Sequence, residues 1–455
     1  MAGNSIKYTK NLKYLGVIFD SKLTWIHHLN SIQDKINSLQ HKIYRISRAT
    51  WGLNPRVKKE IHNKVTEKII SYGHEIWYQD KTKQNIKILK LQRSGLLNIT
   101  KCYKTVSTDA LQVLAGIPPL DLKLKFSSIL FRLKIGNQPA TIQNFLIQPQ
   151  SFNYKKPIIP PWTKTAFSWK YYNSSNITAG ILIYTDGSKM NNKVGGAIVA
   201  FEDGVEMFSH GFRLSDHETV FSAERMAIET AIDFIVHNNI QVSSIISDSR
   251  SVLQALENPN NIDTNIIKIK DKISSCNGTI HLFWIKAHEG FAGNEKADEY
   301  AKVATRKDQI DITSTYDINF IKKLIKKEIV AAWQDRWSNS SKGREVFTLF
   351  PEVKISRIQG DFLINQLITG HGCLGVYQER FFGGSGTCPC GHPSEDRIHI
   401  IFDCPQWNNY REKSFPRNHL EVKMELLLFN KISRAGLRDI MALKLQAALQ
   451  STNDK

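Results

Sequence analysis

The chain has 455 residues and an ordinary hydrophobic content of 41%, but 61 Lys and Arg against 42 Asp and Glu give it a formal net charge of +19. So large a positive excess favours a polyanionic partner, nucleic acid first, over charge that serves only solubility. We expect a soluble intracellular protein, nuclear or cytoplasmic and not secreted, because the sequence has no apolar stretch of membrane-spanning length and no apolar signal segment at its N-terminus.

Residues 1–130 are rich in Lys, Ile and Leu at helical spacing, as in residues 32–52 and 57–77. This pattern predicts long basic amphipathic helices, whose lysine-rich faces either meet solvent or a polyanion. Residues 131–175 are predicted to be a linker, because three prolines fall within residues 157–161.

An α/β pattern follows over residues 176–308, which we interpret as one domain. Asp203-Gly204 between two apolar runs predicts a hairpin, and Ser215 to Glu218 has the form of a capping box that opens a helix. The order of strands and helices predicts a mixed sheet with helices packed on it. The expected elements are strands at 181–186, 194–204, 205–214, 243–249 and 279–288, and helices at 216–237, after 249 and from 293.

Four acidic residues lie at the end or on the inward face of different elements of this domain. Asp186 and Asp248 each end an apolar strand, while Asp298 shares a helix face with Ala301. Glu224 lies on the apolar stripe of its helix, where an ionised carboxylate is costly unless it is paired or bound to a cation. A single such acid would be an ordinary turn or cap residue, but four together indicate a common site.

Two-metal-ion cleavage of a phosphodiester is the chemistry that uses such a cluster. Carboxylates hold two Mg²⁺ ions, with Mn²⁺ as an alternative, about 3.5–4 Å apart; the metals activate water and stabilise the reacting phosphate. Without a metal, the neighbouring acids would raise one another's pKa values.

The segments "YTDGS", "SAERMAI", "ISDSRSVL" and "FWIKAHEGFAGNEKADEYA" resemble, in order, the four acidic motifs of the type 1 ribonuclease H family. The resemblance implies a mixed five-stranded sheet flanked by helices. It also implies a substrate, the RNA strand of an RNA–DNA hybrid, which is recognised through its 2′-hydroxyls. The metal ligands that it implies are Asp186, Glu224, Asp248 and Asp298, and His288 matches the mobile histidine that assists product release or proton transfer.

Small departures from the family pattern leave these acids intact. Ser247 and Ala287 stand where Thr and Gly or Ser are commoner. We expect Gly187 and Ser188, which follow the first acid, to let the substrate backbone come close.

Residues 12–29, 71–79 and 91–122 are similar to the thumb and connecting helices that follow the palm in reverse transcriptases of R1/jockey-like non-LTR retrotransposons. The resemblance implies that residues 1–130 are a thumb-like helical region that tracks a nucleic-acid duplex through its phosphates. A polymerase palm needs its own Asp pair, and the sequence has no Asp-Asp dipeptide. We therefore expect a truncated polyprotein without polymerase activity.

Residues 309–345 are predicted to be a helical connector, and residues 346–455 a small module with a Cys/His cluster. Cys388, Cys390, His399 and Cys404 have plausible spacing for a tetrahedral Zn²⁺ site, although Cys-x-Cys is tight and His392 competes with His399. The alternative is a set of buried free cysteines beside a surface histidine. The segment resembles the C-terminal zinc-knuckle-like module of these retroelements, which favours His399 and implies a structural zinc and nucleic-acid binding.

Together these features predict a Mg²⁺-dependent endonuclease of the ribonuclease H type, which cleaves the RNA strand of RNA–DNA hybrids and has no membrane partner. One alternative is a catalytically silent nucleic-acid-binding remnant of a retroelement. Another is an integrase-type nuclease, since the same fold hosts enzymes that act on duplex DNA.

Overall fold

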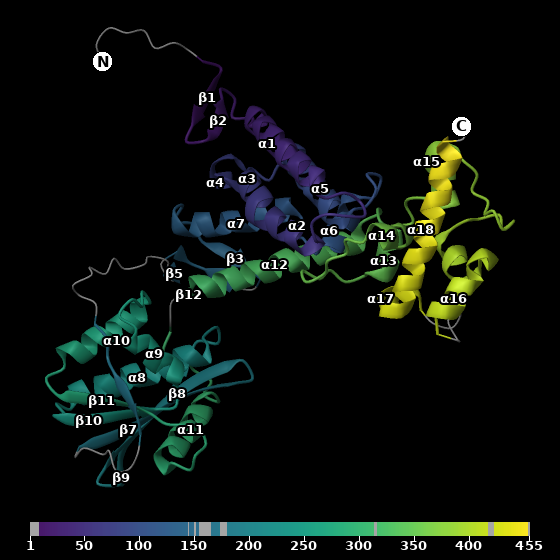
Figure 1. The fold of residues 1–455 in the computed structure, drawn as a ribbon. Coiled ribbons are helices and arrows are strands. Elements are labelled where there is room, and N and C mark those ends of the chain that lie inside the picture. Colours follow the sequence, from purple (N-terminus) through teal and green to yellow (C-terminus); the bar gives the residue numbers. More distant parts are fainter. Residues whose placement is uncertain are drawn as a thin grey trace, which may run out of the picture. The chain divides into compact units, whose positions relative to one another are not determined.

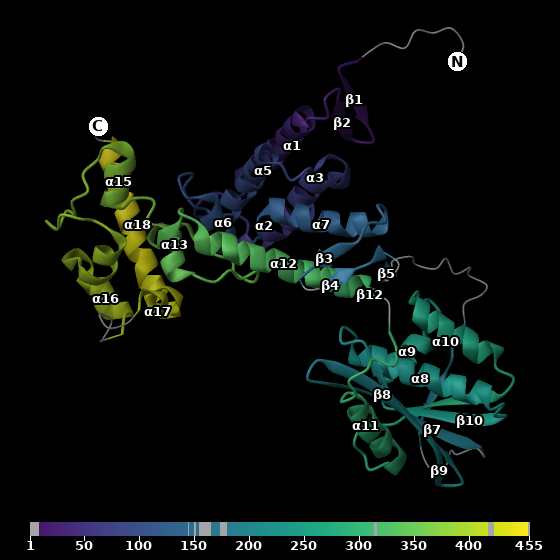
Figure 2. The same ribbon diagram turned by 180° about the vertical axis from the view of Figure 1, so that it is seen from behind.

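The computed structural model describes residues 9–143, 145–149, 152–153, 165–172, 180–313, 316–416 and 423–453. The chain divides into two compact units (Figures 1 and 2): residues 145–322 form one, while Met1–Asn144 and Lys323–Lys455 together form the other. The proline-rich stretch predicted at 157–161 lies outside the described residues. Along the described part of the chain, none of the helices combines the length and apolar character needed to cross a membrane.

A six-stranded mixed sheet forms the centre of the unit 145–322. Its strand order is β6-β11-β10-β7-β8-β9, with β6, β11, β10 and β7 parallel and β8 and β9 antiparallel to their neighbours. The strands are β6 (Trp169–Tyr171), β7 (Ile181–Met190), β8 (Lys193–Glu202), β9 (Val205–Leu214), β10 (Val242–Ser247) and β11 (Thr279–Trp284). The predicted mixed α/β fold is confirmed, but the predicted number of five strands is wrong. Strand β6 has three residues, too few for a period of two to be recognised.

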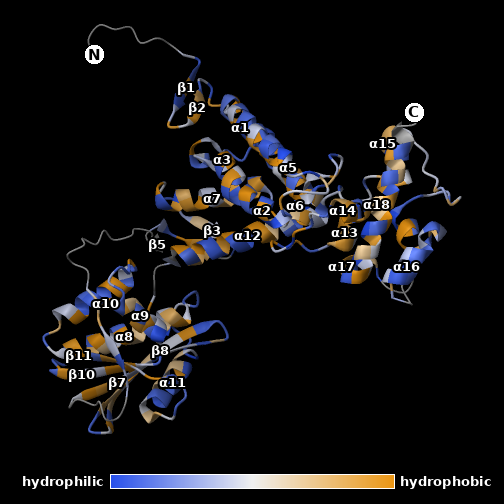
Figure 3. Ribbon diagram, viewed as in Figure 1, coloured by the Kyte–Doolittle hydropathy of each residue, from blue (hydrophilic) through white to orange (hydrophobic). Residues whose placement is uncertain are grey.

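Helices cover both faces of this sheet. Successive residues of a strand face opposite sides, so Ile183 packs with helix α8 while Tyr184 packs with α11. Figure 3 shows the apolar residues concentrated on the strands and on the helix faces that cover them. One face carries α8 (Val220–His237), α9 (Arg250–Glu257) and α10 (Thr264–Ser275), and the other carries α11 (Ala292–Ala304).

Two element boundaries differ from the prediction. Helix α8 begins at Val220, where the side chain of Thr219 accepts from the N–H of Ser222 (3.1 Å); the predicted capping box at Ser215 is instead a turn. Strand β7 continues past Asp186 to Met190, because Gly187 pairs with Gly196 of β8. The predicted hairpin at Asp203-Gly204 is confirmed, and both residues have positive φ (49° and 77°), as a tight two-residue turn requires.

The second unit is mainly helical, with a hairpin of β1 (Asn11–Tyr14) and β2 (Val17–Asp20) before its first helix. Its first half contains α1 (Ile26–Arg45), α5 (Thr82–Thr100), α6 (Thr108–Ala115) and α7 (Leu120–Lys134), which confirm the predicted helical character. The segment expected as one helix over 57–77 is divided into α2 (Pro55–Ile61), a π-helical turn at His62–Thr66, α3 (Glu67–Ser71) and α4 (His74–Trp77). The helical path is continuous through the π-helical turn and breaks after Ser71, where Tyr72 is extended (ψ 123°) and Gly73 has a φ of 62°.

One hydrophobic core joins the two ends of the chain in this unit. It combines Leu111 and Leu114 of α6 with Ile364 of α14 (Phe362–Thr369) and Leu437 of α18 (Lys431–Asn453). The predicted boundaries place these segments in two separate parts, a region over 1–130 and a module over 346–455. The structure instead packs them against each other. An amphipathic pattern shows that a helix has an apolar face, but not which segment covers it.

A buried ion pair also links the two halves of this unit. Arg336 donates from its two terminal nitrogens to the two carboxylate oxygens of Asp121, at 3.0 and 2.8 Å. The Asp121 side chain is only 6% exposed, whereas that of Arg336 is 32% exposed. Removal of Arg336 would therefore leave the buried carboxylate of Asp121 without a counter-charge.

Arg336→Ala should lower the free energy of unfolding by about 3 kcal/mol, because it leaves a buried carboxylate without its counter-charge. Urea denaturation of the whole chain measures this. Lys354→Ala is the control; it removes a pair whose partners are 60% and 72% exposed, and should cost about 0.5 kcal/mol or less. Equal losses in the two variants would contradict a structural role for the Asp121–Arg336 pair.

Candidate active site and metal centres

Three of the four predicted acidic ligands meet beside the central strand. Asp186 lies within β7, Glu224 in the second turn of α8, and Asp248 directly after β10. One carboxylate oxygen of each lies within 4.8 Å of the others. Asp186 and Glu224 are buried and Asp248 is half-buried. Residues far apart in the sequence thus form one carboxylate cluster.

Glycine at position 187 permits this arrangement. A Cβ atom on Gly187 would lie 2.5 Å from the backbone nitrogen of Glu224 and 2.8 Å from Cβ of Ala223. Only glycine lets α8 approach β7 so closely, and that approach brings Glu224 to Asp186. The expectation that Gly187 makes room for substrate is wrong, because the helix backbone fills this space.

Two residues that the sequence analysis did not assign to the site hold Asp248. The indole Nε1 of Trp284 donates to the backbone oxygen of Asp248 at 3.0 Å, and Nδ2 of Asn294 donates to its carboxylate at 3.5 Å. Asn294 is buried in the first turn of α11. The sequence signal for a role at the site is its place in the last of the four acidic motifs, between His288 and Asp298.

Asp298 and His288 lie at the margin of the cluster. Asp298 of α11 makes an ion pair with Lys302 (2.6 Å) and is not among the three acids within 4.8 Å of one another. Its charge still raises the pKa of Asp186 and of Asp248. His288 is exposed, has a φ of 59°, and lies between β11 and α11; its charge lowers the pKa of Asp248.

The carboxylates are destabilised as anions. Burial, and then repulsion by Asp248 and Asp298, raises the pKa of Asp186 to about 7. Burial and the neighbouring acids raise the pKa of Glu224 well above its usual range, and burial raises that of Asp248. The Oε2 atom of Glu224 is buried and has no hydrogen-bond partner among the described residues. An all-oxygen donor set with excess negative charge fits a hard divalent cation such as Mg²⁺.

A second cluster is formed by Cys388, Cys390, His399 and Cys404, whose ligand atoms all lie within 4.8 Å of one another. The sulfurs of Cys388 and Cys404 are 3.7 Å apart, and Sγ of Cys390 is 3.2 Å from Nε2 of His399. A tetrahedral zinc ion with Zn–S bonds of about 2.3 Å separates its sulfurs by about 3.8 Å. The donor types and spacings therefore fit Zn²⁺.

The backbone around these cysteines forms two tight turns. In the first, the N–H of Gly391 donates to Cys388 O (2.9 Å), and that of Cys388 donates to His392 O (2.8 Å). In the second, Cys404 N–H donates to His399 O (2.7 Å) at the end of a π-helical turn. The ring of His392 stacks on His399 at 4.1 Å, and its Nδ1 lies 2.8 Å from the backbone oxygen of Ser394, so the geometry favours His399 as the fourth donor.

Comparison with known proteins identifies the class of the α/β domain. Residues 178–306 match the family model described as RNase H. The chain thus carries an RNase H-family domain.

The chain's relatives are Pol polyproteins of R1 non-LTR retrotransposons. A putative 115 kDa protein in the type-1 retrotransposable element R1DM of Drosophila melanogaster is 31% identical over 137 residues, which are 30% of this chain and 13% of that protein. A retrovirus-related Pol polyprotein from element R1 4 of Nasonia vitripennis is 29% identical over 30% of this chain and 35% of its own length. One from element R1 of Popillia japonica is 26% identical over 42% of this chain and 78% of its own. The matches to the first two relatives thus span about a tenth and a third of their lengths.

Solved structures similar to the domain include two ribonucleases H1. LC11-RNase H1, solved in complex with an RNA/DNA hybrid, is 18% identical and covers 28% of this chain and 96% of its own, with a TM-score of 0.25. RNase H1 from Halobacterium salinarum NRC-1 is 20% identical, covers 27% of this chain and 96% of its own, and has a TM-score of 0.23.

The raised pKa values predict a pH dependence of stability in magnesium-free buffer. The folded protein keeps a proton on Asp186 up to about pH 7, whereas the unfolded chain releases it near pH 4. The free energy of unfolding should therefore fall as the pH rises from about 4 to above 7, by at most about 1.4 kcal/mol per pH unit for each proton.

Denaturation of the whole chain at several pH values measures this slope. Asp186→Asn should make it shallower, because the amide does not titrate and also relieves repulsion of its neighbours. Asp308→Asn, at an exposed position of the same unit, should leave it unchanged. A slope that Asp186→Asn does not alter would contradict the assignment of the raised pKa to this site.

Proposed function

We propose that residues 178–306 form a divalent-metal-dependent endonuclease that cleaves the RNA strand of RNA–DNA hybrids. The observation that carries this proposal is the cluster of Asp186, Glu224 and Asp248, three acids whose oxygens lie within 4.8 Å of one another and whose pKa values are raised. The match of this segment to the RNase H family supports the same reaction class.

In this proposal Asp186, Glu224 and Asp248 hold the metal ions, and Asp298 contributes from the margin. Two bound Mg²⁺ ions would activate the attacking water and offset the charge of the reacting phosphate. Trp284 holds the backbone of Asp248 and Asn294 holds its carboxylate before substrate arrives. The exposed imidazole of His288 can take up or release a proton as the product leaves.

Asp248→Asn should reduce the cleavage rate of a labelled RNA–DNA hybrid with Mg²⁺ by about 10²–10³-fold. The amide keeps the shape of the side chain but removes a negative ligand from the cations, a loss of several kcal/mol of transition-state stabilisation. Product bands on a denaturing gel measure the rate and show which strand is cut.

Asp308→Asn is the matched control, since the same substitution at a fully exposed acid of the unit should leave the rate unchanged. Equal cleavage by both variants would contradict the site assignment. Absence of cleavage by the intact chain would contradict the enzyme proposal and favour a silent nucleic-acid-binding remnant. Strand transfer on duplex DNA would instead favour an integrase-type nuclease.

We also propose that Cys388, Cys390, His399 and Cys404 bind one structural Zn²⁺. With four protein ligands the ion would have no open position, so its contribution would be to fold the two turns that carry the cysteines. The basic helices of residues 1–130 would form a thumb-like surface for nucleic-acid phosphates, as in the retrotransposon proteins that they resemble.

Cys388→Ser and Cys404→Ser should each lower the zinc content from about one ion per chain towards zero and decrease stability, because bound metal contributes directly to folding. Atomic absorption on purified protein measures the metal. Cys276→Ser, at a free cysteine of the other unit, should keep its zinc. Full zinc occupancy in all three variants would rule out this ligand set.

A further inference from the structure

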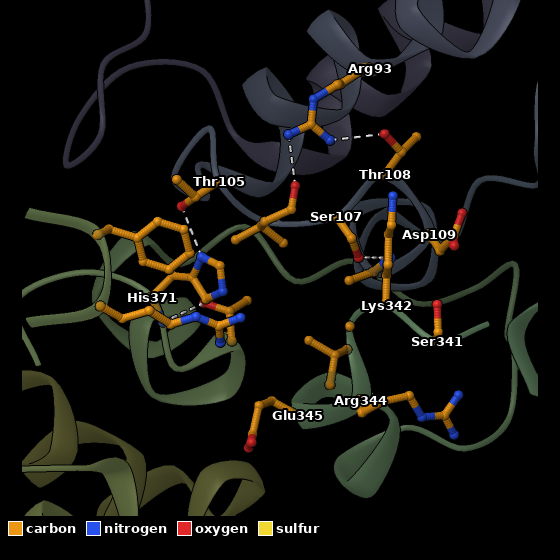
Figure 4. Close-up of a pocket in the computed structure, with 17 residues that line it drawn as sticks. Arg93, Thr105, Ser107, Thr108, Asp109, Ser341, Lys342, Arg344, Glu345 and His371 are labelled. Carbon is orange, nitrogen blue, oxygen red and sulfur yellow. Dashed lines mark hydrogen bonds between the residues drawn. The ribbon is translucent and has the colours of Figure 1, made fainter. Parts of the chain in front are cut away.

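A hollow of about 700 Å³ lies within the helical unit, remote in sequence from the carboxylate cluster. It is bordered by the segment that leads into α6, by residues 341–346, and by α15 (Gly375–Phe382) with the loop before it. Figure 4 shows Arg93, Thr108, Lys342 and His371 arranged around it. The volume suits a ligand of nucleotide size.

The positive charges of this hollow are not neutralised by acidic partners. The guanidinium of Arg93 donates to Thr108 Oγ1 (2.9 Å) and to the backbone oxygen of Val106 (2.7 Å), both uncharged acceptors. In the described parts of the chain, neither Lys342 nor Arg380 makes an ion pair, and both are exposed. The guanidinium carbon of Arg380 lies 5.4 Å from the ring centroid of Phe381, so the hollow is lined by one fixed cation and two flexible ones, of which one rests on that ring.

The other charged residues of the lining are already engaged. Glu345 makes an ion pair with Arg397 (2.6 Å), and Asp109 accepts from the hydroxyl of Ser340 (2.7 Å). Arg344 donates to backbone oxygens and stacks on Phe347, with its guanidinium carbon 3.6 Å from the ring centroid. The lining therefore holds four cations, Arg93, Lys342, Arg344 and Arg380, against two acids, Asp109 and Glu345, and the potential inside the hollow is positive.

An aromatic surface lies beside these cations. Phe381 is 41% exposed, and its ring centroid is 4.8 Å from that of Tyr377 and 5.6 Å from that of His371. His371 is itself fixed by Thr105, whose hydroxyl lies 2.8 Å from Nδ1. The exposed ring of Phe381 can stack on the flat base of a nucleotide, and the cations beside it can bind the phosphate.

We propose that this hollow binds one nucleotide of a single-stranded nucleic acid, with its phosphate on Lys342, Arg380 and Arg93 and its base on Phe381. A free phosphate would leave most of the volume and the ring unused. A duplex keeps its bases stacked inside the helix and offers none to Phe381. The proposal goes beyond the nuclease activity, because it assigns a strand-binding site to the other unit.

Binding of fluorescent 20-nucleotide oligothymidylate to the whole chain, measured by anisotropy without magnesium, tests the proposal. Lys342→Ala with Arg380→Ala should weaken binding about tenfold or more and reduce the slope of log affinity against log salt by at most about 0.7, because both side chains contact the same phosphate. Phe381→Ala should weaken binding about 5- to 100-fold through lost stacking.

Matched variants separate these effects from misfolding. Lys342→Arg with Arg380→Lys keeps both charges, and Phe381→Tyr keeps the ring, so both should bind nearly as the original chain does. Unchanged affinity in Phe381→Ala would overturn the nucleotide site and leave a simple anion site. If the Lys342→Ala and Arg380→Ala changes weakened binding of a 20-base-pair duplex as much as binding of the single strand, the hollow would be only part of a general basic surface. The assay involves no hybrid and no cleavage, so an inactive nuclease would not affect its outcome.

Discussion

The close approach of helix α8 to strand β7 is the contact on which the carboxylate cluster depends. Gly187 lies against the backbone of Glu224, and its strand partner Gly196 would meet the ring of Phe212 if it carried a Cβ. Gly187 and Gly196 therefore let α8 pack close to the sheet, and this places the carboxylate of Glu224 next to that of Asp186. The proximity is unfavourable by itself, as the raised pKa values of Asp186 and Glu224 show. Stability at this point is given up for a site suited to cations.

Around this contact, one set of residues forms the hydrophobic core and another forms the carboxylate cluster. Apolar side chains of β7, β8 and β10 fill the two interfaces with the helices, while the acids occupy positions along the edge where α8, β7 and β10 come together. Other acids of the same unit have ordinary structural partners. Glu229, for example, is buried but surrounded by Arg225, Lys268 and Lys272. Comparison with Glu229 shows what distinguishes Glu224, whose Oε2 has no partner among the described residues.

The sequence allowed the α/β order and the Asp203-Gly204 hairpin to be predicted from local periodicity and turn residues. The meeting of Asp186, Glu224 and Asp248 could be predicted because they stand in the motifs that resemble the ribonuclease H family. The sequence did not reveal the three-residue strand β6, which is too short to show a period. Nor did it reveal that Trp284 and Asn294 hold Asp248, since these hydrogen bonds join segments that only the fold brings together. The shared core of α6, α14 and α18 could not be predicted either, because it too joins segments that only the fold brings together.

That shared core has a consequence for the order of events on the ribosome. Residues 145–322 form a unit whose strands and helices are all close in sequence, so it can fold as soon as it emerges. The segment up to Asn144 emerges earlier, yet Leu111 and Leu114 lack their covering helices until the last 133 residues, 323–455, are made. At about 5–20 residues per second, the intervening synthesis takes on the order of tens of seconds. During that interval the segment up to Asn144 exposes an incomplete hydrophobic surface, and a chaperone would bind there rather than to the unit 145–322.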